Sequence, residues 1–348
     1  MLRKWLDPLV FDRVLWTYRP HGKRDTQGVG KAVGPLLEEV IADGGKMTAP
    51  AILAAADIQA HMTSEDLLPK LKDTSTPEDI RLAALNVIAK GTPEKSLLKP
   101  LLKDSSKVIH QRALEILAEV APKEALAVVK TVLIEKDVRR QQFAFSVLAK
   151  IQGKDADQVL LHELKKLKNL SPALHLDLLE ACQGRPALSS ALKEVENQYK
   201  EGPLGPYLMT LEGGDAKRGE YLFFNHNSQC MRCHKHGRFG GVAGPALTGI
   251  GKKQDRRYLL ESMIQPQAAI PPGYGVTTVT LKDNKVIAGT LVKESKTELL
   301  IRSGDGKEEL VKRANIKSQT PVISAMPPMS TLLSKRDLRD LIEFLATK

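Results

Sequence analysis

Apolar residues recur at spacings of three and four through the long segment from about Gly34 to Tyr199. Short clusters of Pro, Gly, Asp and Ser interrupt this pattern. Such spacing places the apolar positions on one face of an α-helix, and the clusters mark helix ends. We therefore expect residues 35–200 to form a series of short amphipathic helices. No structure is assigned to the N-terminal extension, residues 1–34.

A weak repeat is present within this helical stretch. Three segments carry charged residues early and then an apolar stripe with small alanines: IRLAALNVIAK, IHQRALEILAEVA and VRRQQFAFSVLAKIQ. Aligning Ala84, Ala113 and Ala144 gives offsets of 29 (113 − 84) and 31 (144 − 113) residues. ALHLDLLEACQG is a looser copy, in which Cys182 is expected to be buried and inert. Because such units bury their faces by stacking, we expect a HEAT-like α-solenoid, with an irregular helical bundle as the alternative.

The pattern changes after residue 200. Two Pro and four Gly in EGPLGPYLMTLEGG predict a linker at residues 201–214, and Asp215 is the expected N-cap of the helix AKRGEYLFFNHN. A further helix is expected near Arg256–Ile264. Between residues 274 and 319, β-branched and polar residues alternate and turn residues separate the runs, which predicts four or five short strands in a small barrel-like or curled sheet. A last helix is expected over Ser334–Ala346, with Ser334 as its N-cap.

Composition constrains the function only loosely. The 348 residues indicate about two or three domains. The net charge of +11 is compatible with an acidic partner, but the Lys residues are spread along the chain, as on an ordinary solvated surface. No run of about 18 apolar residues is present, so no transmembrane segment is expected. The opening MLRKWLDPLVFDRVLW has charges within its apolar run and predicts no clean signal peptide.

The candidate chemistry lies in the motif CMRCH, which begins at Cys230. The spacing C-x-x-C-H suits two thioether bonds to haem vinyl groups, so we expect Cys230 and Cys233 to hold a haem covalently and His234 to be its proximal iron ligand.

Three other uses of the motif remain open. A redox-active C-x-x-C is typical of a strand-to-helix context, whereas here the motif follows a helical pattern and precedes a Gly-rich loop. A zinc site needs further ligands, for which His226 and His236 are the nearby candidates, although they form no second paired set. A disulfide between the two cysteines would leave His234 without a role.

The segment from about Gly213 to Lys348 resembles the C-terminal haem-binding domain of large multi-domain bacterial proteins, the planctomycete and verrucomicrobial type. The shared features, in chain order, are RGEYLFF, CMRCH, GPALTGIG, YLLESMIQP, TLKDNKVIAGTL, SAMPPM and LRDLIEFL. In those proteins the domain commonly follows HEAT-like repeats, which in turn often follow a propeller resembling sugar dehydrogenases. No propeller is expected from the residues of this sequence.

The resemblance implies a mainly α chain in which residues 215–348 form a class I cytochrome c domain with a β-rich insert at about 274–319. It implies that the Pro245 carbonyl accepts a hydrogen bond from the other ring nitrogen of His234, which fixes the ring. It also implies that Gly219 permits a close helix contact and that Phe223 is buried. The 92 residues from His234 to Met326 (326 − 234) exceed the span in a minimal cytochrome c, and the insert accounts for the difference.

The distal ligand is expected to be a methionine, since thioether sulfur suits haem iron. Met326 precedes a proline and lies just before the last helix, where the resembled cytochromes present their axial Met. It is preferred to Met329. Three further methionines are weaker candidates because they lie in the linker, in the motif and on a helix stripe: Met209, Met231 and Met263.

These expectations predict an electron-transfer protein that carries one covalent haem c, meets a redox partner protein and works in the periplasm or otherwise outside the cytoplasm. No catalytic motif of the G-x-S-x-G, H-E-x-x-H or phosphate-loop type is present, so the chain is not expected to be an enzyme by itself. It could instead be the electron-accepting part of a quinoprotein-type dehydrogenase complex. Displacement of Met326 would favour a haem sensor or peroxidase. Nucleic-acid binding is not expected.

Overall fold

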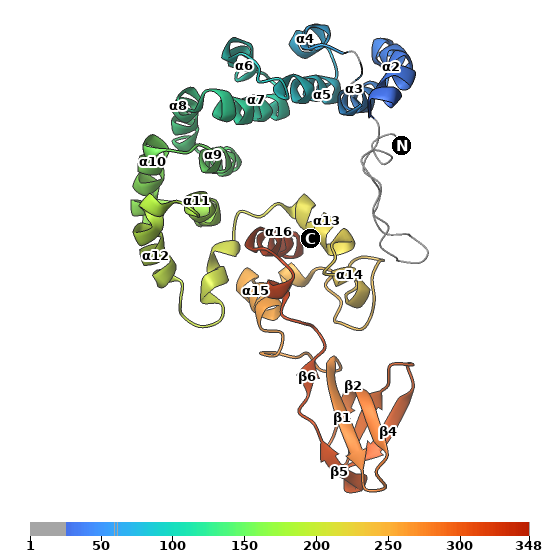
Figure 1. Cartoon of the computed structure of the whole chain (residues 1–348). Helices are drawn as coiled ribbons and strands as arrows, with labels where there is room; N and C mark the ends of the chain where they lie inside the picture. Colours follow the sequence, from blue (N-terminus) through green and yellow to red (C-terminus); the bar gives the residue numbers. More distant parts are fainter. Residues whose placement is uncertain (1–25, 59, 61, 348) are drawn as a thin grey trace. The chain divides into compact units, whose positions relative to one another are not determined.

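The computed structural model describes residues 26–58, 60 and 62–347. The chain is mainly helical, with a small antiparallel sheet towards its C-terminus (Figure 1). It divides into two compact units, one containing the chain up to Ile134 together with Phe143–Ala156, the other containing Glu135–Gln142 and the chain from Asp157 onward. Residues 1–25 of the expected N-terminal extension lie outside the described residues. They include the opening segment for which no clean signal peptide is predicted. The rest of the extension begins helix α2.

In the first unit, each helix packs on its neighbours: α2 on α3, α3 and α4 on α5, α5 on α7, and α6 and α8 on α7. The aligned alanines Ala84, Ala113 and Ala144 are all fully buried, as expected of small residues where helices approach closely. The helix bounds are α2 Thr26–Asp43, α3 Thr48–Asp57, α4 Ser64–Lys72, α5 Glu78–Ala89, α6 Lys95–Leu101, α7 Lys107–Val120, α8 Pro122–Leu133 and α9 Val138–Lys150, the last of which spans the division between the units.

A buried ion pair joins α5 to the turn that precedes α7. Arg81 of α5 binds the carboxylate of Asp104, which lies just before α7, and its Nε donates to the Leu71 carbonyl at 3.0 Å. The hydrogen bond from Arg81 lowers the pKa of Asp104. Because both side chains are almost fully buried, each charge depends on the other for its compensation.

The second unit begins with the helices α10 (Lys154–Lys165, which starts at the division), α11 (His175–Cys182) and α12 (Ser189–Gln198). The Cys182 side chain is fully buried, and burial raises the pKa of its thiol to about 12. The thiol is therefore protonated at neutral pH, which agrees with the expected inert cysteine.

Residues 201–214 differ from the exposed linker that their composition suggests. The short 3-10 helix Gly205–Thr210 ends in a fully buried threonine. The carbonyl of Gly213 accepts a hydrogen bond from the Gln142 side chain at 2.9 Å, so the end of this stretch is tied to α9. Its first residues, 201–203, are exposed in a row, whereas most of the residues after them are buried or partly buried. The glycine and proline residues here permit close packing of the backbone, so this segment is not a free linker.

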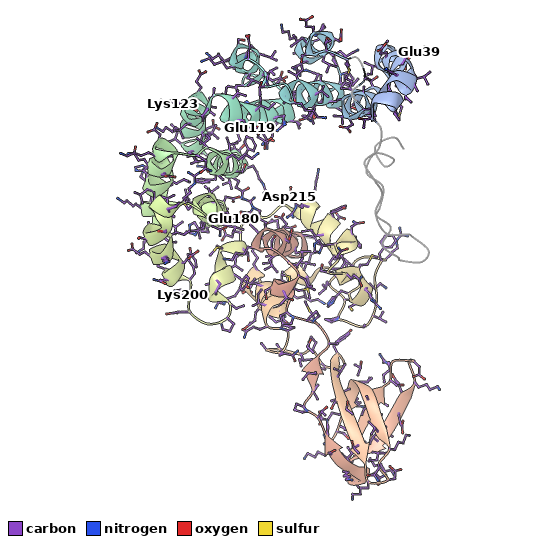
Figure 2. The ribbon with its side chains drawn as sticks, in the orientation of Figure 1. Glu39, Glu119, Lys123, Glu180, Lys200 and Asp215 are labelled. Carbon is purple, nitrogen blue, oxygen red and sulfur yellow. The ribbon has the colours of Figure 1, made fainter. Side chains whose placement is uncertain are left out.

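The CMRCH motif begins with the short helix α14 (Cys230–Cys233), and the same part of the chain contains the helices α13 (Ala216–Asn225), α15 (Arg256–Ile264) and α16 (Lys335–Thr347). Asp215, labelled in Figure 2, caps α13 as expected. Its side chain accepts hydrogen bonds from two backbone amides at the start of this helix. Helices α13 and α16 cross at Gly219, where an added β-carbon would lie only 2.0 Å from the Asp340 carbonyl oxygen. Phe223 is buried in the shared core, so both expected packing roles on α13 are confirmed.

The insert forms one antiparallel sheet with the strand order β4-β3-β2-β1-β5, and β6 also pairs with β1. Strands β4 and β5 are the two ends of this order, so the insert is an open sheet rather than a closed barrel. It has its own apolar core, which includes Val279, Leu299 and Ile301. The strand bounds are β1 Gly275–Leu281, β2 Val286–Glu294, β3 Glu298–Arg302, β4 Glu308–Lys312, β5 Ile316–Gln319 and β6 Ile323–Ser324.

Ion pairs join α16 to α11. Arg339 donates to the fully buried carboxylate of Asp177 at 2.6 Å, and Arg336 pairs with Glu180, which Figure 2 labels on α11. These charged contacts make α11 part of the support of the last helix. Among the described residues, no helix combines the length and apolar character needed to cross a bilayer.

Candidate cofactor site

The two cysteines of the motif lie on the single-turn helix α14, which starts after Gln229 in a left-handed conformation (φ 54°). Cys230 is partly buried, with its Sγ 3.6 Å from the Ser228 hydroxyl, and burial raises the pKa of its thiol. Cys233 is exposed. Both are free thiols in this structure, as is Cys182, so neither is engaged in a disulfide.

His234 is held in a defined orientation. Its Nδ1 lies 2.8 Å from the Pro245 carbonyl oxygen, as expected from the sequence. Because a carbonyl can only accept, Nδ1 carries a proton; in the neutral ring the lone pair then lies on Nε2, which is the form that ligates a metal. Gly244 packs against the ring, and its amide donates to the Cys233 carbonyl at 2.8 Å. The loop after the motif thus fixes both the tautomer and the plane of the imidazole.

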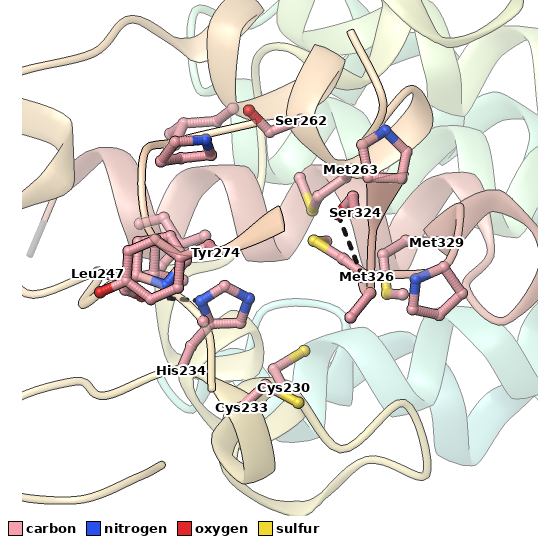
Figure 3. Close-up of a pocket in the computed structure, with 18 of the residues that line it drawn as sticks. Cys230, Cys233, His234, Leu247, Ser262, Met263, Tyr274, Ser324, Met326 and Met329 are labelled. Atoms are coloured by element: carbon pink, nitrogen blue, oxygen red, sulfur yellow. Dashed lines mark hydrogen bonds between the residues drawn. The ribbon is translucent and has the colours of Figure 1, made fainter. Parts of the chain in front are cut away.

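Cys230, Cys233, His234, Pro245 and Met326 all line one cavity of about 270 Å³. His234 and Met326 lie on opposite sides of it, and the two cysteines lie together along one edge (Figure 3). Much of the remaining wall consists of apolar side chains, among them Phe223, Leu247, Leu259, Leu341 and Leu345.

Three of the five candidate methionines line this cavity: Met263, Met326 and Met329. Met329 and Met263 are buried members of the surrounding core, whereas Met326 is partly buried and packs against that core. Met209 instead is buried with its sulfur 3.9 Å from the Lys335 ammonium, and Met231 is exposed.

The other histidines near the motif have different surroundings. His236 packs among the rings of Phe223, Phe224 and Phe344, and its Nε2 has no hydrogen-bond partner in the described structure. Burial lowers its pKa, which favours the neutral ring. His226 bonds to Ser228. Within the described ranges, no three side chains of the types His, Cys, Asp or Glu gather as metal ligands.

Sequence reasoning missed two residues of this site. Gly244 contacts the His234 ring; it is the first residue of GPALTGIG, but no role was expected for it. Gln267 bonds through its side chain to both backbone groups of Ser324, two residues before Met326. No local pattern could have revealed that contact, because the two residues are 57 positions apart.

Comparisons of the chain with protein-family models and with curated proteins give no match.

The donor set and the lining of the cavity fit a covalently bound haem. Two thiols lie at one edge, an imidazole with a free Nε2 faces inward, a thioether lies across from it, and the walls are mostly apolar. A cavity with this lining suits a large, flat and mainly apolar group.

Proposed function

We propose that the protein is a c-type cytochrome that transfers electrons through one covalently attached haem. The observation that carries the proposal is the fixed His234 ring, held by Pro245 through Nδ1, across an apolar cavity from Met326. In this proposal, residues 215–348 form a class I cytochrome c domain with the sheet as an insert, and the helices before them form a HEAT-like scaffold.

Each site residue has a distinct role in this proposal. Cys230 and Cys233 would hold the haem through thioether bonds, while His234 and Met326 would be its axial ligands. When bound, haem supplies a one-electron couple at its iron. The Pro245 carbonyl accepts a hydrogen bond from Nδ1–H of His234 and so would strengthen this ring as an iron ligand, and the soft Met326 sulfur favours the reduced state. The apolar wall excludes water and so limits the structural response to a change of charge.

A partner can approach at the loop that follows the motif. Phe239 and Val242 are exposed there, and Arg232, Lys235 and Arg238 are exposed beside them. We propose that this cationic face meets an acidic redox protein outside the cytoplasm, where haem c is attached. The rate of electron transfer between the protein and this partner should then fall as ionic strength rises, because salt screens the attraction between their charges.

Expression together with a haem-attachment system, followed by pyridine haemochrome analysis, tests the proposal. We expect one haem per chain with the spectrum of a haem linked by two thioether bonds. The reduced protein should bind carbon monoxide poorly, because a six-coordinate iron offers no free position. A chain that takes up no haem would overturn the proposal, and rapid binding of carbon monoxide would favour the sensor or peroxidase function instead.

A further inference from the structure

We infer that Gln267 is a positioning residue for Met326 and that it acts by clamping the backbone of Ser324. The inference rests on the proposed function, since it assigns a role towards the proposed distal ligand.

The clamp uses both ends of one side-chain amide. The Gln267 Oε1 accepts a hydrogen bond from the Ser324 backbone N–H at 2.8 Å, and its Nε2 donates to the Ser324 carbonyl at 3.2 Å. The Ser324 hydroxyl in turn accepts a hydrogen bond from the Met326 backbone N–H at 3.2 Å. Two steps of hydrogen bonding therefore connect Gln267 to the backbone that carries the sulfur.

The loop that carries Met326 needs this support, because the strand β6 that precedes it and anchors its N-terminal end is short. Strand β6 has only two residues, and it is held by pairing of Ile323 and Ser324 with the start of β1. On the other side of the loop, Met329 is buried in the core. A ladder of two pairs opens readily, so the side-chain clamp decides how well this end of the loop is fixed.

Gln267 also connects the loop to the wall of the cavity itself. It follows Pro266, a buried lining residue that comes soon after α15, and it precedes the lining residues Ala269 and Ile270. The distal loop is thereby tied to the segment that shapes the cavity and not to the sheet alone. Gln267 itself is exposed, so replacing it removes the clamp without opening the core.

The test uses the haem-loaded full chain with Gln267→Ala, Gln267→Glu and the control Gln265→Ala. Gln267→Glu keeps an acceptor for the Ser324 N–H but loses the donor to its carbonyl. Gln265 is the same residue type two positions earlier and is not part of the clamp. The readouts are hydrogen exchange of peptides covering residues 322–328, the weak far-red band of a methionine–iron(III) bond, and the rate of carbon monoxide binding to the reduced protein.

Loss of two hydrogen bonds should raise the open population of the loop, and with it both the exchange rate and the carbon monoxide rate, by about tenfold in Gln267→Ala. The far-red band should weaken, Gln267→Glu should be intermediate, and Gln265→Ala should match the original protein. Unchanged exchange and an unchanged band in Gln267→Ala would overturn the inference. Absence of the band from the original protein would instead count against Met326 as ligand, and exchange would still decide whether Gln267 holds the loop.

Discussion

Gly244 packs against the imidazole of His234 so closely that an added β-carbon would lie 2.6 Å from Cε1 and 2.8 Å from Nδ1. No other residue type fits there without moving the ring. The same ring donates a hydrogen bond from Nδ1 to the Pro245 carbonyl. Gly244 therefore fixes the position of the ring, and Pro245 fixes the nitrogen that carries its proton.

Replacing Gly244 by alanine should therefore displace the His234 ring and break its bond to Pro245. We expect a fall of about 1–3 kcal/mol in the free energy of unfolding, because the crowded ring must shift. We also expect a lower yield of haem-loaded protein with an altered ligand spectrum. Gly304→Ala is the control, since an added β-carbon meets nothing within 4 Å there. Equal spectra and stabilities for the two variants would contradict the role of Gly244.

Covalent attachment is tested by replacing both cysteines, Cys230→Ala with Cys233→Ala. The spacing suits two thioether bonds, so haem should resist acid–acetone extraction in the original protein and should be extracted from the double variant. Cys182→Ala is the matched control, because that thiol is fully buried on α11 and does not line the cavity. Equal extraction from the original protein and the double variant would rule out thioether attachment.

The first proteolytic cut between the helices before residue 200 and the region of the CMRCH motif should lie at Lys200, not deeper in residues 201–214. Lys200 is exposed and so are the next three residues, whereas the stretch after them is packed and hydrogen-bonded. The two fragments should stay together after trypsin treatment, because Arg339 and Arg336 of α16 hold Asp177 and Glu180 of α11. Size-exclusion chromatography of the cut protein measures this, and Lys200→Gln should abolish the cut. Prompt separation of the fragments would show that the α11–α16 contact is weak.

The sequence predicted local elements well because their signals are local. The cap at Asp215, the helix Arg256–Ile264 and the alternating strands all follow from neighbouring residues, and the structure has them. The packing of residues 201–214 was not predictable, since glycine and proline favour a tight turn against a neighbour as much as a free linker. The Gln267–Ser324 clamp depends on how β6 returns to β1, which no local pattern encodes.

The Arg81–Asp104 pair predicts a specific loss of stability in acid. Its hydrogen bond lowers the pKa of Asp104 in the folded state below the unfolded value of about 3.9. The stabilisation is therefore fully present above that value and is lost as pH falls through the folded pKa. Asp104→Ala should cost roughly 3 kcal/mol at pH 7, because Arg81 is left buried without a partner. The difference from the original protein should shrink as the pH falls below about 3.9 in urea unfolding, and a constant difference would contradict the pairing.

Met326 and Met329 give the sharpest test of the axial ligand, because both line the cavity but only one is proposed to reach the iron. Met326→Ala should remove the far-red methionine–iron(III) band, lower the reduction potential and open the iron to added ligands, since water or no ligand replaces the sulfur. Met329→Ala should keep all three properties. It should instead lower the free energy of unfolding by about 2–5 kcal/mol, because Met329 is a buried member of the core beneath the last helix.

The two variants must be measured side by side with Met263→Ala, the third sulfur of the cavity. Met263 lies on α15 and is buried in the same core, so its loss should also affect stability more than the spectrum. Each result identifies a ligand: whichever variant alone loses the band carries the sulfur that binds iron. If all three keep it, another methionine supplies the sulfur, and the loop between β6 and the last helix serves packing rather than ligation. If Met326→Ala alone loses it, the partly buried methionine between the Ser324 anchor and the buried Met329 is the distal ligand.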